Sequence, residues 1–99
     1  MKREKLSGLQ IELLCLVADK YEPDVSALQE KYERWHDTEI RYQTVYQALE
    51  RLTELEYLEK NAIDGRSNCY MLTTKGAKLI NTHRKLVVDH TQQIDEVLD

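Results

Sequence analysis

The chain has 99 residues, of which 41% are hydrophobic and 32% are charged, and its formal net charge is −4 at pH 7. This length suits one small domain, and the hydrophobic fraction can form a core without a metal or a disulfide, while the interspersed charges argue against wholesale disorder. No apolar run approaches the ~20 residues of a membrane span, and no signal-peptide pattern is present, so we expect neither a membrane segment nor secretion.

The first predicted helix follows a capping box, with Ser7 at the N-cap and Gln10 three residues later. It runs to about Lys20 and is apolar on most sides, which is typical of a helix packed by neighbours all round. Cys15 lies in this stretch and is interpreted as core filling rather than as a reactive thiol. Because Cys69 is far away in sequence, we expect no disulfide or metal-ligand set, and a reduced, cytoplasmic setting follows.

The second predicted helix spans about Asp24 to His36, with Pro23 at its start and Asp24 in its first turn. One apolar stripe recurs at spacings of three and four residues and consists of Val25, Leu28, Tyr32 and Trp35. Trp35 could floor a small-molecule pocket, but a lone tryptophan on such a stripe is more often part of the core. In the polar connection that follows, Ile40 is a candidate for a one-residue strand bridge.

The third predicted helix runs from about Tyr42 to Glu56. Its inward stripe is Val45, Leu49, Leu52 and Leu55, helped by Ala48. Near its beginning the outer face carries Gln43, Thr44 and Gln47, and Arg51 lies one turn further along. Exposed helix surface usually consists of Glu and Lys, so we interpret this uncharged, hydrogen-bonding face as a contact surface rather than as ordinary solvated surface.

A β-hairpin and a last helix complete the chain. Residues 57–63 and 68–73 have strand character, and Asp64-Gly65 between them is a hairpin-turn dipeptide. A two-stranded ribbon is marginally stable alone and must pack against the helices. Thr74 then caps a helix that is predicted to reach nearly to Asp99.

This order of elements predicts an α+β, mainly α, fold class. We expect a winged helix-turn-helix domain over residues 1–74, with three helices plus a two-stranded β-wing, and a long C-terminal dimerisation helix over residues 75–99. In that plan one helix enters the major groove of DNA and the wing extends the footprint on the phosphates.

Two runs of the sequence resemble the PadR-like transcriptional regulators. Residues 44–52 with 55–59 are similar to the recognition helix of that family, and residues 66–76 are similar to its wing. Members often carry Gly where this chain has Glu56, so we expect a slightly different turn into the wing. Residues 38–43 replace a Gly- and Pro-rich approach to the recognition helix. The resemblance implies a dimeric repressor or activator, often responsive to a small-molecule effector that the sequence does not identify.

The candidates for DNA contact are Tyr42, Gln43, Thr44, Tyr46, Gln47, Arg51, Lys60, Arg66 and Ser67. The two glutamines and Thr44 are placed to read base edges, because Gln can bond adenine through two hydrogen bonds. The two tyrosines and Arg51 suit phosphates, although Tyr46 equally suits the edge of the core. Arg66 could enter a minor groove or meet a phosphate, and Lys60 and Ser67 are weaker backbone candidates. Lys2, Arg3 and Lys5 are further candidates, as a short basic arm.

The distribution of charge is more informative than its sum. Residues 40–85 carry eight basic against five acidic side chains, whereas residues 19–39 and 86–99 each have a net charge of −4. A polarised molecule can present a positive face to phosphates despite an acidic total, and ordinary surface charge is the alternative.

A heptad pattern in the last helix predicts a homodimer. Ile80, His83, Val87, His90, Ile94 and Val97 recur at spacings of three and four residues. A parallel or antiparallel helix of a second copy would bury this seam, giving a two-fold dimer suited to a pseudo-palindromic double-stranded DNA operator. The two histidines either lie at the edge of the seam or face the partner. In the second case burial favours the neutral ring and low pH weakens the dimer, unless nearby carboxylates reverse the sign.

Two other classes of function are weighed against this one. A Gly-rich phosphate loop, a nucleophile elbow and a helical His-x-x-x-His pair are all absent from the sequence, so we expect neither an enzyme nor a cofactor. The other rival is a winged helix that contacts a protein through the polar face of the third helix, without binding DNA directly.

Overall fold

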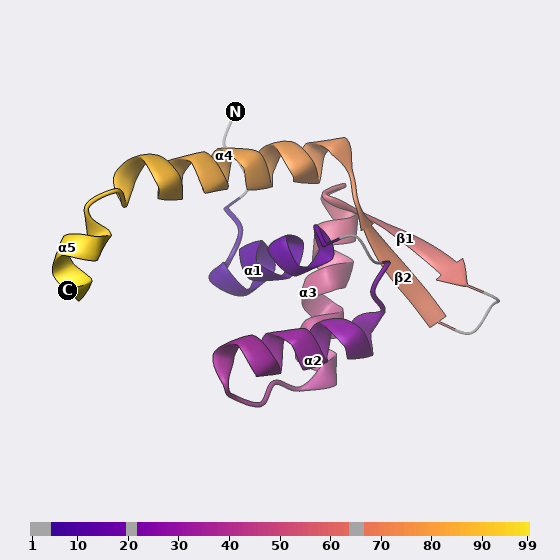
Figure 1. Ribbon diagram of the computed structural model, residues 1–99. Helices are drawn as coiled ribbons and strands as arrows, with labels where there is room; N and C mark the ends of the chain where they lie inside the picture. The colour runs from indigo at the N-terminus through magenta and orange to yellow at the C-terminus, as the bar shows by residue number, and fades with distance from the viewer. Residues whose placement is uncertain (1–4, 20–21, 64–66) are drawn as a thin grey trace.

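The computed structural model describes residues 5–19, 22–63 and 67–99. The elements in chain order are α1 (Gly8–Val17), α2 (Val25–His36), α3 (Tyr42–Glu54), β1 (Leu58–Ile63), β2 (Ser67–Leu72), α4 (Thr74–His90) and α5 (Ile94–Leu98). The predicted order of three helices, a hairpin and a helix is therefore confirmed. In Figure 1 the hairpin projects from one side of the three-helix body, while α4 runs above α1 towards the other side and ends in α5.

Side-chain caps set the beginnings of three helices. The Ser7–Gln10 capping box is present as predicted, and α1 ends at Val17, earlier than expected. Asp24 is the N-cap of α2 and accepts a hydrogen bond from the Ala27 N–H at 2.8 Å, so it precedes the helix instead of lying in its first turn. In the same way Thr73, and not Thr74, caps α4. Each of these residues is extended and places its oxygen over free N–H groups.

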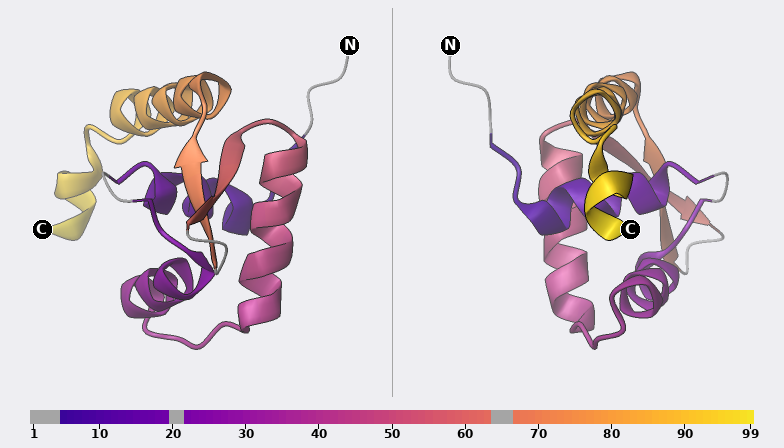
Figure 2. Two further views of the ribbon diagram at one scale, coloured as in Figure 1. Left: turned by 90° about the vertical axis from the view of Figure 1, so that its right-hand side faces the viewer. Right: turned by 60° about the vertical axis from the view of Figure 1, so that its left-hand side comes forward.

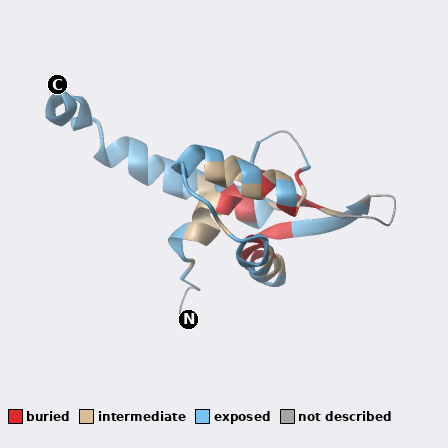
Figure 3. Ribbon diagram, turned by 90° about the horizontal axis from the view of Figure 1, so that it is seen from below, coloured by how far each residue is buried: buried red, intermediate tan, exposed pale blue. Residues whose placement is uncertain are grey.

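The core lies between the three helices and the base of the hairpin. Val45, Leu49 and Leu52 are fully buried, which confirms most of the predicted inward stripe of α3. The strands β1 and β2 pair in antiparallel register, with Leu58 opposite Leu72, and the hairpin contributes the buried Tyr70 to the core. Figure 3 shows the buried segments gathered here, and the ribbon thus packs on the helices as a marginal two-stranded sheet must.

Two predicted core residues are on the surface. Cys15 is exposed, because α1 packs through the side that carries Leu13, Leu14 and Val17 and leaves residue 15 facing outward. Trp35 is 81% exposed and lines a small surface pocket with Leu16 at the end of α2. The interpretation of both residues as core was therefore wrong, whereas Cys69 is buried.

The prediction of one helix reaching nearly to Asp99 is also wrong. Helix α4 ends at His90 and the short α5 begins at Ile94. At this point the Thr91 hydroxyl donates to the carbonyl oxygen of Val87, and such a side-chain bond competes with continuation of the helix. Ile94 and Val97 therefore belong to a separate short helix. Among the described residues, no helix is long and apolar enough to cross a membrane.

Candidate nucleic-acid interface

The outer face of α3 is polar and open at its beginning. Gln43, Thr44 and Gln47 are all exposed, Tyr42 is 49% exposed and Tyr46 is half-buried. The helical repeat places residues 43 and 47 on one line, because residues four apart lie above one another. The structure thus puts the three candidates for base contact on one accessible surface, with the two tyrosines beside them.

Side chains of α2 hold the segment that leads into α3. The N–H of Ile40 donates to the Glu33 carboxylate at 2.9 Å, and the Gln29 amide donates to the Ile40 carbonyl at 2.8 Å. Both backbone groups of Ile40 are satisfied by side chains and the residue forms no strand bridge, contrary to the prediction. Glu33 itself is half-buried. The sequence gives little indication that Glu33 binds the Ile40 backbone, because nothing marks an isolated Glu as the partner of a loop residue seven positions away.

The hairpin is tied to α3 through Glu50. The Glu50 carboxylate accepts hydrogen bonds from the Lys60 ammonium of β1 at 3.0 and 3.2 Å and from the Tyr70 hydroxyl of β2 at 3.2 Å. The hydrogen bond to Glu50 raises the pKa of Lys60. Burial, and then the Glu50 charge, raise the pKa of Tyr70. The left view of Figure 2 shows the hairpin beside α3.

The base of the hairpin has a second attachment on its other edge. The Tyr70 N–H donates to the Pro23 carbonyl at 2.9 Å, so the segment before α2 takes the place of a third strand for one hydrogen bond. Neither this bond nor the role of Glu50 can be predicted from the sequence, because both depend on contacts between distant parts of the chain. The position of the hairpin relative to α3 is therefore fixed by backbone and side-chain bonds together.

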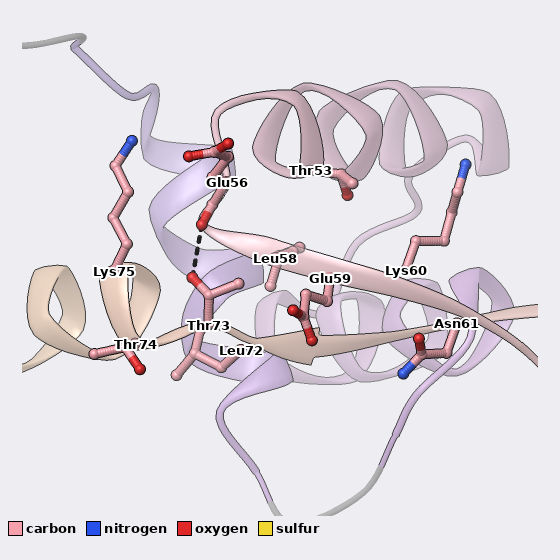
Figure 4. A pocket seen from close by; sticks show the side chains of 10 residues that line it. All are labelled: Thr53, Glu56, Leu58, Glu59, Lys60, Asn61, Leu72, Thr73, Thr74 and Lys75. Carbon is pink, nitrogen blue, oxygen red and sulfur yellow. Dashed lines mark hydrogen bonds between the residues drawn. The ribbon is translucent and has the colours of Figure 1, made fainter.

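The turn from α3 into β1 is narrow and closely packed. Glu56 adopts a left-handed conformation with φ of 67°, which is the region that favours glycine. Its carbonyl accepts from the Thr73 hydroxyl at 2.6 Å, as Figure 4 shows. Lys75 donates to the Leu55 carbonyl at 2.7 Å and lies 4.5 Å from the centre of the Tyr57 ring. The turn thus accommodates a glutamate at a position where left-handed backbone is required.

Two of the cations predicted to meet phosphates, Arg51 and Lys60, have carboxylate partners. Lys60 pairs with Glu50, and Arg51 pairs with Glu54 at 3.1 Å. Of the remaining candidates, Lys5 is exposed and Ser67 begins β2, whereas Lys2, Arg3 and Arg66 lie outside the described residues. Within residues 5–19, 22–63 and 67–99, no three His, Cys, Asp or Glu side chains are arranged to hold a metal ion.

Comparison with known proteins identifies the fold. No family model matches the chain, and no curated protein matches its sequence. Among solved structures, RosR of H. salinarum is 19% identical with a TM-score of 0.79, covering 94% of this chain and 90% of its own. MepR, a transcription regulator of the Staphylococcus aureus multidrug efflux pump MepA, is 16% identical with a TM-score of 0.77 over 95% and 67% of the two chains. A single-site variant of MarR from E. coli is 22% identical with a TM-score of 0.76 over 94% and 71%. With the observed three-helix body and two-stranded wing, these likenesses show that the chain has the winged helix-turn-helix fold.

Proposed function

We propose that this protein is a transcriptional regulator that binds double-stranded DNA sequence-specifically, with α3 in the major groove and the wing beside it. The observation that carries the proposal is the exposed, uncharged and hydrogen-bonding start of α3, formed by Gln43, Thr44 and Gln47. Amide side chains can read base edges through paired hydrogen bonds, whereas a merely solvated face has no need of them. The fold it shares with MepR, itself a transcription regulator, supports the proposal.

Phosphate contacts would come from groups around that face. Tyr42 and Tyr46 flank it on the side of the wing, and their hydroxyls suit phosphate oxygens. Arg51 lies one turn further along α3, and Lys60 lies on the adjacent strand. Ser67, which begins β2, and Arg66, its neighbour in the sequence, complete the proposed footprint.

The finer assignment to PadR-like regulators rests on local geometry as well as on the motifs. In that family a glycine often stands where Glu56 does, and the left-handed φ of Glu56 fits such a position. The glycine of the wing motif corresponds to Gly76, which is buried where a side chain would strike the Tyr57 carbonyl oxygen. Both features fit the residues that the resemblance singles out.

We further propose that the protein acts as a homodimer through its C-terminal region. Beyond Ile80, which packs on the core, α4 carries the exposed apolar side chains Leu86, Val87 and Val88. Figure 3 shows the end of α4 and α5 exposed along their length. A second copy would cover this apolar surface and place two α3 helices on a pseudo-palindromic operator.

The six proposed seam residues and the division of the chain at residue 74 remain part of this proposal. His83 and His90 are exposed in the single chain, so a partner would be needed to bury them. Sedimentation at fixed salt between pH 8 and 5 tests whether a dimer forms and whether the two histidines make its dissociation depend on pH. A monomer throughout refutes the dimer, and a dimer whose dissociation constant ignores pH refutes only the histidine response.

The first test of the function is selection of bound sequences from a random duplex pool, followed by titration of the selected site. Gln43→Ala or Gln47→Ala should cost ~1–3 kcal/mol on that site and relax base preference, whereas Arg51→Ala should weaken all duplexes alike. The reason is that base-edge bonds discriminate and phosphate bonds do not. Full discrimination by both glutamine variants would show that α3 does not read the sequence.

One observation favours a second candidate, a winged helix that contacts a protein. Two cations near the α3 face, Arg51 and Lys60, are both held in ion pairs, which lowers the positive charge presented there. Titration with duplex DNA at varied salt separates the candidates. A steep fall of affinity with salt marks phosphate binding, and its absence favours the protein partner.

A further inference from the structure

We infer that Glu50 and Glu54 limit binding to non-specific duplex by holding Lys60 and Arg51 in internal ion pairs. The inference rests on the proposed DNA-binding function and concerns the same face. Carboxylates are unfavourable on a surface that binds phosphates, and the inference gives these two a role.

The two glutamates continue the line of base-reading candidates along α3. Residues 43, 47, 50 and 54 are separated by four, three and four positions, which is the repeat of one helix face. The line therefore changes from two amides at the beginning of the helix to two carboxylates at its end. A helix that enters the major groove with its first turns brings its later turns close to the sugar-phosphate backbone, where a carboxylate is repelled.

Each carboxylate is matched to one cation. Glu54 is exposed and lies 3.1 Å from the Arg51 guanidinium on the same helix. Glu50 is half-buried, lies 3.0 Å from the Lys60 ammonium on β1, and is fixed in place by the Tyr70 hydroxyl. The Glu50 pair therefore spans the gap between α3 and the wing. A phosphate reaching either cation meets a carboxylate already bound to it.

The consequence differs between specific and non-specific DNA. Non-specific binding depends almost entirely on cations that replace counterions of the phosphates, so neutralising two of them lowers it directly. The hydrogen bonds that Gln43 and Gln47 would make to bases involve uncharged groups and are not offset by these carboxylates. A specific complex keeps these base contacts, so the two carboxylates reduce binding at the many competing non-specific sites without removing recognition of the operator.

The experiment compares Glu50→Gln and Glu54→Gln with wild type on a random-sequence duplex, by fluorescence anisotropy between 50 and 200 mM salt. Glutamine keeps the shape and the acceptor oxygen while removing the charge. We expect each variant to bind about 3- to 10-fold more tightly at the lowest salt, with a salt slope steeper by up to about one unit. Adding Lys60→Met to Glu50→Gln should return the affinity towards that of wild type.

Two controls isolate the effect. Glu30→Gln removes a charge from a matched pair on α2, where Glu30 lies 3.0 Å from Arg34, and should leave duplex affinity within about twofold of wild type. Tyr70→Phe removes the hydrogen bond to Glu50 without changing any charge, and should leave the salt slope as in wild type. Thermal melting monitors folding. If Glu50→Gln is destabilised, Glu54→Gln still tests the inference, because Glu54 is exposed and its substitution should leave the fold intact.

The outcomes distinguish this inference from the function on which it rests. If wild type binds with a clear salt slope and neither glutamine variant exceeds Glu30→Gln, the inference is wrong and the DNA-binding proposal stands. If neither wild type nor any variant binds duplex at any salt, both are wrong. Tighter, more salt-dependent binding by Glu50→Gln and Glu54→Gln alone supports both.

Discussion

Substituting alanine at the two described glycines should change stability in opposite directions. Gly76 is buried in the first turn of α4, and a Cβ there would collide with the Tyr57 carbonyl oxygen and lie 2.9 Å from a methyl group of Leu72. Gly8 opens α1 and has no atom within 4 Å of the position that a Cβ would take. The same substitution is therefore blocked by backbone at one site and unhindered at the other.

The expected magnitude for Gly76→Ala follows from what must move. The Tyr57 carbonyl accepts a hydrogen bond from the Thr73 N–H at 3.2 Å, and Thr73 caps α4, so any shift of the helix start loosens that bond and the cap. Overpacking of this kind costs ~1–3 kcal/mol, and loss of the cap adds ~1 kcal/mol. The better helix propensity of alanine returns about 1 kcal/mol. We expect a net loss of ~1–3 kcal/mol for Gly76→Ala, and a gain of ~0.4–1 kcal/mol for Gly8→Ala.

Urea denaturation and thermal melting at one fixed protein concentration measure both changes, since a dimer makes the midpoint depend on concentration. The slope of free energy against urea should stay the same, so that the midpoint alone reports stability. For a domain of this size each kcal/mol shifts the melting temperature by roughly 4–8 °C. A Gly76→Ala variant as stable as wild type would refute the close approach of α4 to Tyr57.

Three further predictions concern the wing, the C-terminal helices and alkaline pH. Arg66→Ala should reduce the salt slope of duplex binding by about one unit if Arg66 meets a phosphate, and an unchanged slope would mean that it is only solvated. Val87→Asp with Ile94→Asp, both exposed seam residues, should give a folded monomer by sedimentation, because the charges prevent burial of the seam; an intact dimer would place the interface elsewhere. Because the pKa of Tyr70 is raised above 10.0, its contribution to stability is fully present below pH 10 and is lost as pH rises further. Tyr70→Phe should flatten the alkaline side of the stability curve measured by urea midpoints, and an equally steep decline in the variant would contradict the assignment.

Local signals in the sequence predicted the beginnings of elements well. The Ser7 capping box and the inward stripe of α3 each depend on residues within four positions of one another, so neighbouring sequence suffices to define them. The hairpin was predicted for the same reason, since strand-forming runs flank a turn dipeptide. The exposure of the polar residues at the start of α3 could also be predicted from the sequence, because the apolar stripe that is buried lies on the opposite face of the helix.

Features that depend on tertiary contacts were missed or misplaced. An apolar residue is buried only where a neighbour covers it, and Trp35 is 81% exposed although the last turn of α2 contacts α1 through His36 and Glu12. Ile40 lacks a strand partner because side chains from α2 satisfy its backbone groups. The role of Glu50 joins residues ten and twenty positions away, and no spacing rule marks such a partner. The break after His90 depends on a side-chain bond that competes with the helix.

The acidic total charge is compatible with DNA binding because of where the carboxylates lie. The acidic residues of 86–99 belong to the end of α4 and to α5, which lie at the opposite side of the molecule from the wing in Figure 1. Over a longest dimension of 50 Å, such charges are separated from the wing by several Debye lengths of ~8–10 Å and are screened at physiological salt. Glu50 and Glu54 are different, because they lie on the face of α3 itself and contact the cations that phosphates would need. Affinity for DNA in this protein should therefore respond to these two carboxylates far more than to the four at the C-terminus, although all of them contribute equally to the net charge.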